Sequence, residues 1–173
     1  TWVRVDSHDG RISYTGSWID EDSSGHYQGK AKEAKDAPGA AASFTFTGTG
    51  FRWIGQMDSN YGLGRVYVDG KLVAVGDANA PSGNPLQATI LELRGLSEGQ
   101  HTVKVEAESG APIQVDAFEY YNGTLDTTVS SVVIHPSAPI LLEVNERIGV
   151  LATAMHGDRV AVLTDQLEYA VEA

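Results

Sequence analysis

The sequence predicts an all-β protein, and three observations support this fold class. Nineteen glycines in 173 residues punctuate short apolar runs, which suits many strands joined by tight turns. Residues 43–47 alternate apolar and polar side chains, with Phe44 and Phe46 on one face of an expected strand. The dipeptide Asp69-Gly70 separates two apolar runs, and this arrangement favours the type I′ turn of a β-hairpin.

The same patterns place the other elements in order along the first 121 residues. The expected strands are residues 2–6, 43–47, 51–55, 65–68, 71–75, 86–93, 101–108 and 113–121. Polar stretches that contain glycine or proline are expected to be loops, at residues 20–29, 57–64 and 77–85. Residues 30–42 have a partly helical composition, but Pro38-Gly39 ends it, so at most one helical turn is expected there.

The strand pattern breaks at Asn122-Gly123 and resumes after a Thr/Ser-rich stretch, residues 125–131. Later strands are expected at residues 132–134, 140–144, 148–153 and 159–162. This segment is too short for a complete seven-strand sandwich. We therefore predict a β-domain over residues 1–122, a linker over 123–131 and part of a second β-domain over 132–173.

Composition and charge limit the partners. The formal net charge is −11 and no basic cluster occurs, so neither nucleic acid nor an anionic membrane surface is expected to bind. No apolar run reaches the roughly 18 residues of a membrane-spanning helix. The absence of cysteine excludes disulfides and Cys-ligated zinc. An acidic surface is compatible with neutral sugars or bound cations.

An ordered series of short motifs along residues 1–121 resembles a widespread bacterial carbohydrate-binding module of the galactose-binding-like, family 6/35 type. The motifs are residues 11–18, 42–55, 64–70, 99–105 and 115–120. The resemblance implies a jelly-roll β-sandwich of about eight strands that binds a polysaccharide or oligosaccharide without catalysis. It also implies a parent catalytic domain in the same polypeptide, a glycoside hydrolase or polysaccharide lyase that is secreted or held on a bacterial cell surface.

Residues 126–173 resemble the beginning of a bacterial immunoglobulin-like domain, in the motifs at residues 132–136, 142–146 and 169–171. Domains of that type usually act as spacers in multi-domain surface enzymes.

Sugar binding requires aromatic rings that stack on the apolar face of a pyranose and polar side chains that fix its hydroxyls. The expected loops and strands supply both kinds of side chain. The predicted carbohydrate-binding residues are His26, Tyr27, Arg52, Asp58, Asn60 and Tyr61.

Each of these residues also has a purely structural interpretation. Asp58 and Asn60 are typical turn residues, and Tyr61 before Gly62 can simply end a turn. His26 and Tyr27 can be ordinary surface residues. Arg52 alternates with Phe51 and Trp53, so it is expected to point away from the core. Trp2, Tyr14 and Trp18 are expected to pack in the core or at an edge.

The family resemblance further implies a structural Ca²⁺ that ties the first strand to the last, with Asp6 and Asp116 in matching positions. Carboxylate and carbonyl oxygens are the ligands that Ca²⁺ requires. The alternative is that Asp6 ends a turn and Asp116 lies at a sheet edge. The run Asp20-Glu21-Asp22 lacks the spacing of an EF-hand and is interpreted as a solvated loop.

Two functions other than sugar binding stay open. One is a structural or adhesion spacer; the other is a small glycosidase or lyase that uses a pair of loop carboxylates. No spacing singles out an acid and a base, no Gly-x-Ser-x-Gly motif occurs, and the five histidines lack metal-ligand spacing.

Overall fold

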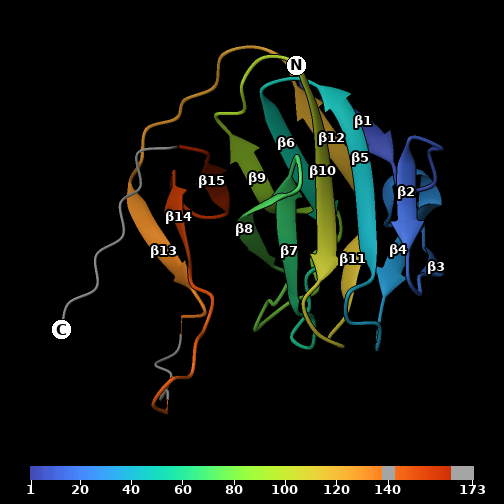
Figure 1. Cartoon of the computed structure of the whole chain (residues 1–173). Helices are drawn as coiled ribbons and strands as arrows, with labels where there is room; N and C mark the ends of the chain where they lie inside the picture. The colour runs from blue at the N-terminus through green and yellow to red at the C-terminus, as the bar shows by residue number, and fades with distance from the viewer. Residues whose placement is uncertain (138–142, 165–173) are drawn as a thin grey trace.

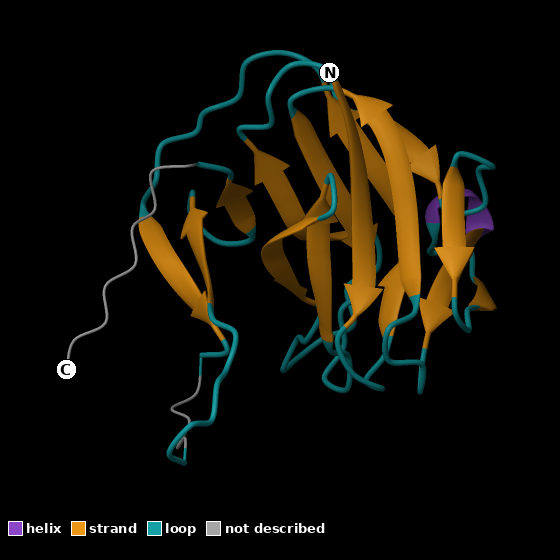
Figure 2. Ribbon diagram, in the orientation of Figure 1, coloured by secondary structure: helices purple, strands orange, loops and turns teal. Residues whose placement is uncertain are grey.

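The computed structural model describes residues 1–137 and 143–164, and in them the chain is a β-sandwich with a single short 3-10 turn (Figures 1 and 2). The predicted all-β sandwich is therefore confirmed. The first sheet has the order β1-β12-β6-β9-β15-β14-β13. Its strands are β1 (Val3–Asp6), β12 (Ala117–Tyr121), β6 (Gly50–Gly55), β9 (Ala88–Arg94), β15 (Val160–Val162), β14 (Leu151–Met155) and β13 (Ser131–His135).

The second sheet has the order β2-β5-β10-β7-β8, and a small third sheet has the order β11-β4-β3. The strands of the second sheet are β2 (Ile12–Thr15), β5 (Ala41–Thr47), β10 (Gln100–Ala107), β7 (Leu63–Val68) and β8 (Lys71–Asp77). Those of the third are β11 (Ile113–Val115), β4 (Lys30–Ala34) and β3 (Ile19–Asp22). The 3-10 turn η1 (Tyr27–Gly29) leads into β4.

The core lies between the first two sheets and follows the period-2 pattern of the strands. Phe44 and Phe46 of β5 face Phe51 of β6 and Phe118 of β12, with Phe51 and Phe118 ring centroids 5.1 Å apart. Trp53 is fully buried, as its alternation with Phe51 predicts, and its indole N–H donates to the Gln114 carbonyl at 2.8 Å. The residue between them, Arg52, therefore lies on the opposite face of β6.

The hairpin between β7 and β8 has the predicted geometry. Asp69 and Gly70 have φ of +51° and +83°, and a positive φ at both central residues is the mark of a type I′ turn. The Asp69 carboxylate also accepts the backbone N–H of Thr102 at 2.9 Å and contacts the His101 ring at 2.7 Å. These contacts hold the hairpin against β10.

Two sequence-based expectations for residues 20–42 are wrong. The expected loop at 20–29 contains the end of β3 and the turn η1, and the segment 30–42 has no helical turn: it contains β4, a turn at residues 35–40 and the start of β5. β4 pairs with β3 on one side and β11 on the other, and buries Ala31 and Glu33 on one face. Tertiary pairing has overridden the weak helix propensity of this alanine-rich stretch.

The expected strand at 113–121 is interrupted at Asp116, which separates β11 in the third sheet from β12 in the first. This break lets one continuous segment serve two sheets, and it fixes the buried Asp116 carboxylate between them.

The described part of the C-terminal segment continues the first sheet. β15 pairs in parallel with β9, and the expected strand at 148–153 begins only at Leu151 (Figure 1). The Arg159 guanidinium donates to the Asp77 carbonyl at 2.6 Å, and Arg94 donates to the Asp126 carbonyl at 2.9 Å. Residues 140–142 of the expected strand 140–144 lie outside the described residues. The division into domains at 122 and 132 stays a prediction.

Candidate functional site

Four charged residues form a straight row across four neighbouring strands of the first sheet. Arg4 on β1 is directly opposite Glu119 on β12, Glu119 is opposite Arg52 on β6, and Arg52 is opposite Glu92 on β9. All four lie on the face of the sheet that points away from the core, since their strand neighbours Val5, Phe118, Trp53 and Leu93 are buried in it. We call these four residues the Arg–Glu row.

Positive and negative side chains alternate along the Arg–Glu row, and hydrogen bonds link each residue to the next. Glu119 accepts from Arg4 Nε at 2.7 Å and from Arg52 Nη1 at 3.2 Å. Glu92 accepts from Arg52 Nε and, at 2.6 Å, from Arg94 Nε. The side chains of Glu92 and Glu119 are only 3% and 9% exposed, whereas those of Arg4 and Arg52 are 30% and 28% exposed. The carboxylates of the row are therefore buried, and its guanidinium groups are partly exposed to solvent.

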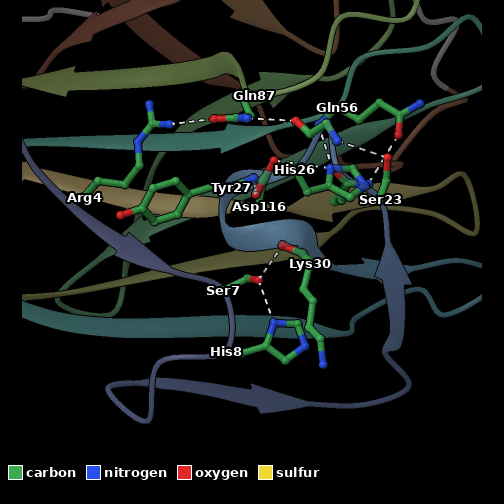
Figure 3. Close-up of polar contacts among 12 residues, drawn as sticks. Arg4, Ser7, His8, Ser23, His26, Tyr27, Lys30, Gln56, Gln87 and Asp116 are labelled. Carbon is green, nitrogen blue, oxygen red and sulfur yellow. Dashed lines mark hydrogen bonds and ion pairs between the residues drawn. The ribbon is translucent and has the colours of Figure 1, made fainter.

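Two aromatic rings lie beside the guanidinium groups. The Arg52 Cζ atom is 3.8 Å from the centroid of a Trp2 ring, and the Arg4 Cζ atom is 5.3 Å from the centroid of Tyr27. Such contacts are attractive because the ring face is electron-rich. Arg4 Nη1 also donates to Gln87 Oε1 at 2.9 Å, and Gln87 in turn donates to the Gly25 carbonyl (Figure 3).

The buried Asp116 side chain holds the segment that carries Tyr27. Asp116 is fully buried, and its carboxylate accepts the backbone N–H of Tyr27 at 2.8 Å and contacts His26 Nδ1 at 3.3 Å (Figure 3). Burial raises the pKa of Asp116, while the Tyr27 N–H and the His26 ring oppose that rise by stabilising the charged form. The η1 turn also holds Gln28 at φ +54°.

A second group of polar residues lies on the loop between β6 and β7. The Tyr61 hydroxyl donates to Glu33 Oε1 at 2.5 Å, and Glu33 is mostly buried, which raises the pKa of its carboxyl. An isolated backbone β-bridge joins Asp58 to Asn79. The Asp58 carboxylate accepts the backbone N–H of Ser59 at 2.6 Å. Asn60 is exposed at the tip of the loop.

The structure therefore divides the six predicted binding residues into three sets. Tyr27 and Arg52 both border the outer face of the first sheet, on which Arg4 connects them. Asp58, Asn60 and Tyr61 form the separate loop group. His26 is buried, and its ring contacts the Asp116 carboxylate in the protein interior.

Sequence reasoning missed Arg4, Glu92 and Glu119 and assigned Trp2 to packing. Period-2 alternation in their strands does place the three charged residues outward. Their alignment in one row depends on strand register, which a single sequence does not specify.

The two predicted calcium ligands differ in their fitness for that role. Asp6 Oδ2 is a buried carboxylate oxygen without a hydrogen-bond partner, which suits an oxygen-seeking cation. Both Asp116 oxygens already have protein partners. Within residues 1–137 and 143–164, no group of three or more His, Cys, Asp or Glu side chains is arranged to hold a metal ion. Asp6 Oδ2 therefore has no protein partner that a cation would displace, whereas a cation at Asp116 would replace its present contacts.

A serine, a histidine and an aspartate are linked in the order found in hydrolases. Ser7 Oγ contacts His8 Nδ1 at 2.9 Å, and His8 Nε2 contacts Asp20 Oδ1 at 3.0 Å (Figure 3 shows Ser7 and His8). Ser7 is completely buried, and its hydroxyl also contacts the Lys30 carbonyl. A nucleophile must be accessible to its substrate, and Ser7 is not. We therefore interpret these hydrogen bonds as structural contacts that link the end of β1 to the third sheet.

A cavity of about 650 Å³ lies where the C-terminal strands meet β8. Its lining residues are mainly aliphatic, among them Val73, Leu151 and Val162, and include no aromatic ring. It therefore lacks the stacking surface that a sugar site needs.

No protein-family model matches the sequence. Two curated enzymes of Flavonifractor plautii are similar to it. "A type blood N-acetyl-α-D-galactosamine deacetylase" is 36% identical over 119 residues, which make up 69% of this chain and 15% of that enzyme. "A type blood α-D-galactosamine galactosaminidase" is 34% identical over 131 residues, which make up 76% of this chain and 12% of that enzyme.

Among solved structures, a Paenibacillus xanthan lyase matches with a TM-score of 0.53 and 15% identity, over 78% of this chain and 14% of that one. This likeness shows a shared fold. The chain thus spans 12–15% of the length of the curated enzymes it matches. It is similar to a small β-sandwich portion of larger carbohydrate-active enzymes. Among the described residues, no helix is long and apolar enough to span a membrane.

Proposed function

We propose that this chain is a non-catalytic carbohydrate-binding module that holds a parent carbohydrate-active enzyme on its glycan. The observation that carries the proposal is that one small segment recurs in two enzymes whose names state different reactions, a deacetylase and a galactosaminidase. Because a similar segment occurs in both enzymes, we infer that it serves a property that the two enzymes share. The two names have in common a galactosamine-containing glycan of A type blood, not a bond that is broken.

The outer face of the first sheet supports a sugar site. Trp2 and Tyr27 supply rings that can contact the C–H face of a pyranose, and Arg4 and Arg52 supply forked donors for its oxygens. The row is hydrogen-bonded before any ligand arrives, so little side-chain entropy is lost on binding. We place the primary site here, at Tyr27 and Arg52, and a secondary contact at Asp58, Asn60 and Tyr61.

Function in the parent enzyme follows from tethering. A module with modest affinity keeps the catalytic domain close to its substrate and raises the effective concentration without adding a catalytic contact. We propose that the parent is a glycoside hydrolase or polysaccharide lyase, secreted or held on the cell surface. The family 6/35 type of the module is part of the same proposal.

The experiment is a glycan array with the purified chain, followed by affinity measurements on variants. We expect Tyr27→Ala to weaken binding by about 1 kcal/mol, roughly fivefold, as for loss of one stacked ring. Tyr67→Ala is the matched control, because Tyr67 also lies beside a cation, Lys104, but on the second sheet. Tyr61→Ala tests the loop group separately.

Three outcomes separate the candidate functions. Loss of binding in Tyr27→Ala with normal binding in Tyr67→Ala supports the proposed site. Loss only in Tyr61→Ala moves the site to the loop group. Absence of binding to every glycan on the array overturns the proposal in favour of a structural spacer.

We propose separately that a structural Ca²⁺ binds at Asp6. The unpartnered Asp6 Oδ2 is the observation that favours it. We expect Ca²⁺ to raise the melting temperature of the chain and Asp6→Asn to abolish that rise. An unchanged melting temperature with Ca²⁺ would remove the ion from the proposal and leave sugar binding untouched.

A further inference from the structure

The Arg–Glu row and Arg94 comprise three guanidinium groups and two carboxylates, so this surface carries a net charge of +1 and presents N–H donors, on a chain whose net charge is −11. All four carboxylate oxygens of Glu92 and Glu119 are already engaged with guanidinium groups. Both carboxylates are buried, whereas the two arginines of the row, Arg4 and Arg52, are partly exposed. A ligand on this face therefore meets N–H donors and finds no free carboxylate of the row to accept from it.

The donors that remain can be counted. A guanidinium has five N–H groups and no acceptor. Arg52 directs Nε to Glu92 and one Nη1 hydrogen to Glu119, which leaves the second Nη1 hydrogen and both Nη2 hydrogens for a ligand. Arg4 directs Nε to Glu119 and one Nη1 hydrogen to Gln87, which leaves the corresponding hydrogens for a ligand. Complementary ligand groups are hydroxyl and carbonyl oxygens.

This donor surface distinguishes two forms of one sugar. The acetamido group of an N-acetylhexosamine is neutral and carries a carbonyl acceptor. The amino group of a free hexosamine is protonated near neutral pH, so it has donors only and a positive charge. Placed against guanidinium groups, the protonated amine has no acceptor to offer them and is repelled.

We propose that the outer face of the first sheet selects a neutral galactose-configured sugar, above all its N-acetylated amino form, over the corresponding free amine. The inference rests on the proposed function, because it names the ligand class of that same site. Together the names of the two similar enzymes cover both forms, N-acetylgalactosamine and galactosamine. The module would thus retain the acetylated glycan and release the deacetylated one.

The long-range field of an acidic chain works against this preference. At physiological salt the Debye length is about 8 Å, so distant carboxylates are largely screened. Contacts within the site are screened much less. The guanidinium groups at the site therefore decide which form binds.

The test compares the methyl α-glycosides of N-acetylgalactosamine, galactose and galactosamine as ligands of the whole chain, by NMR titration at neutral pH. We expect galactosamine to bind on the order of tenfold more weakly than N-acetylgalactosamine, because one charge is brought against the arginines. Galactose lacks both substituents and should fall nearer to the acetylated sugar. Added salt should narrow the difference.

Arg4→Gln is the informative variant. It removes one exposed cation while Arg52 still partners Glu119, so the fold should be retained. We expect it to reduce the preference for the acetylated sugar severalfold. Lys104→Gln, which removes a cation on the second sheet, should leave the preference unchanged.

Each contrary result has its own meaning. Equal or tighter binding of galactosamine overturns this inference and leaves the proposed function standing. An unchanged preference in Arg4→Gln overturns the assignment to the row. Failure of all three glycosides to bind, while other glycans on the array do, overturns the ligand class. Failure of every glycan overturns the proposed function itself.

Discussion

Asp116 and Tyr27 lie far apart in the sequence, yet Asp116 Oδ1 accepts the backbone N–H of Tyr27 at 2.8 Å. The second carboxylate oxygen contacts His26, so one buried side chain holds two consecutive residues of a surface turn. The break between β11 and β12 brings Asp116 to this point. The ring of Tyr27 is thereby held beside Arg4 without any strand of its own.

Asp116→Ala should destabilise the chain and disturb the site together. The substitution leaves the partly buried Tyr27 N–H and the buried His26 ring without their partner, which typically costs about 1–3 kcal/mol. Urea denaturation measures the change in the free energy of unfolding. Asp22→Ala, at an exposed position, is the control and should change little. A variant as stable as the parent would show that the pair contributes nothing to folding.

Gly64→Val and Gly76→Val should each destabilise the core around Trp53. A Cβ at Gly64 or Gly76 would come within 2.6 Å of the Trp53 ring. The ring is fully buried, so the surrounding side chains leave it no room to move away. Overpacking of this kind costs roughly 1–3 kcal/mol. Thermal unfolding followed by tryptophan fluorescence reports the loss. Gly10→Ala adds a Cβ into open space and should leave the melting temperature unchanged.

Arg52→Met should cost more stability than Arg4→Met. Arg52 partners both Glu92 and Glu119, whereas Arg4 partners only Glu119 in the row. Removing Arg52 leaves the buried Glu92 with Arg94 alone, and breaking a buried pair costs about 3 kcal/mol. The double variant Arg52→Met with Glu92→Met should recover most of that loss. Equal costs for the two arginine variants would contradict the central position of Arg52.

The contact between His101 and Asp69 should make stability depend on pH. Burial disfavours the charged ring, but hydrogen bonds to the Ser97 carbonyl and the Asp69 carboxylate outweigh it and raise the pKa of His101. A raised pKa in the folded state means that protonation favours folding. The contribution is fully present below the unfolded histidine pKa of about 6.5 and is lost as pH rises through the folded value.

Asp69→Asn tests this dependence, because asparagine tolerates the positive φ at position 69. The difference in melting temperature between the parent and Asp69→Asn should be larger near pH 5.5 than near pH 9. In a His101→Gln background the same substitution should show little dependence on pH over this range. A difference that grows as pH rises would reverse the assigned sign.

Removal of residues 123–173 should expose the outer edge of β9. The Glu92 amide donates to the Arg159 carbonyl at 2.8 Å across the parallel pair of β9 and β15. In the shortened chain this amide should exchange its hydrogen much faster, while the Val103 amide in the middle of β10 should not. Hydrogen-exchange NMR measures both. Unchanged protection of Glu92 would indicate that β15 does not pair with β9 in solution.

Local sequence signals were sufficient for several elements. The alternation of Phe51, Arg52 and Trp53 predicted two core residues and one outward residue, because side chains of a strand alternate between its faces. Asp69-Gly70 predicted a type I′ turn, since few dipeptides tolerate two successive positive φ angles. Where the local signal was weak, as in the alanine-rich β4, pairing with β3 and β11 decided the structure instead.

By itself the sequence determined that the chain is all-β, that Arg52 points outward and that the Asp-Gly turn closes a hairpin. These features depend on neighbours within a few positions. Only the tertiary structure decided that Arg4, Glu119, Arg52 and Glu92 share one row, that His26 is buried against Asp116, and that Tyr61 contacts Glu33. Each of these contacts joins residues from different strands or loops, so it depends on strand order and register, which local patterning does not encode.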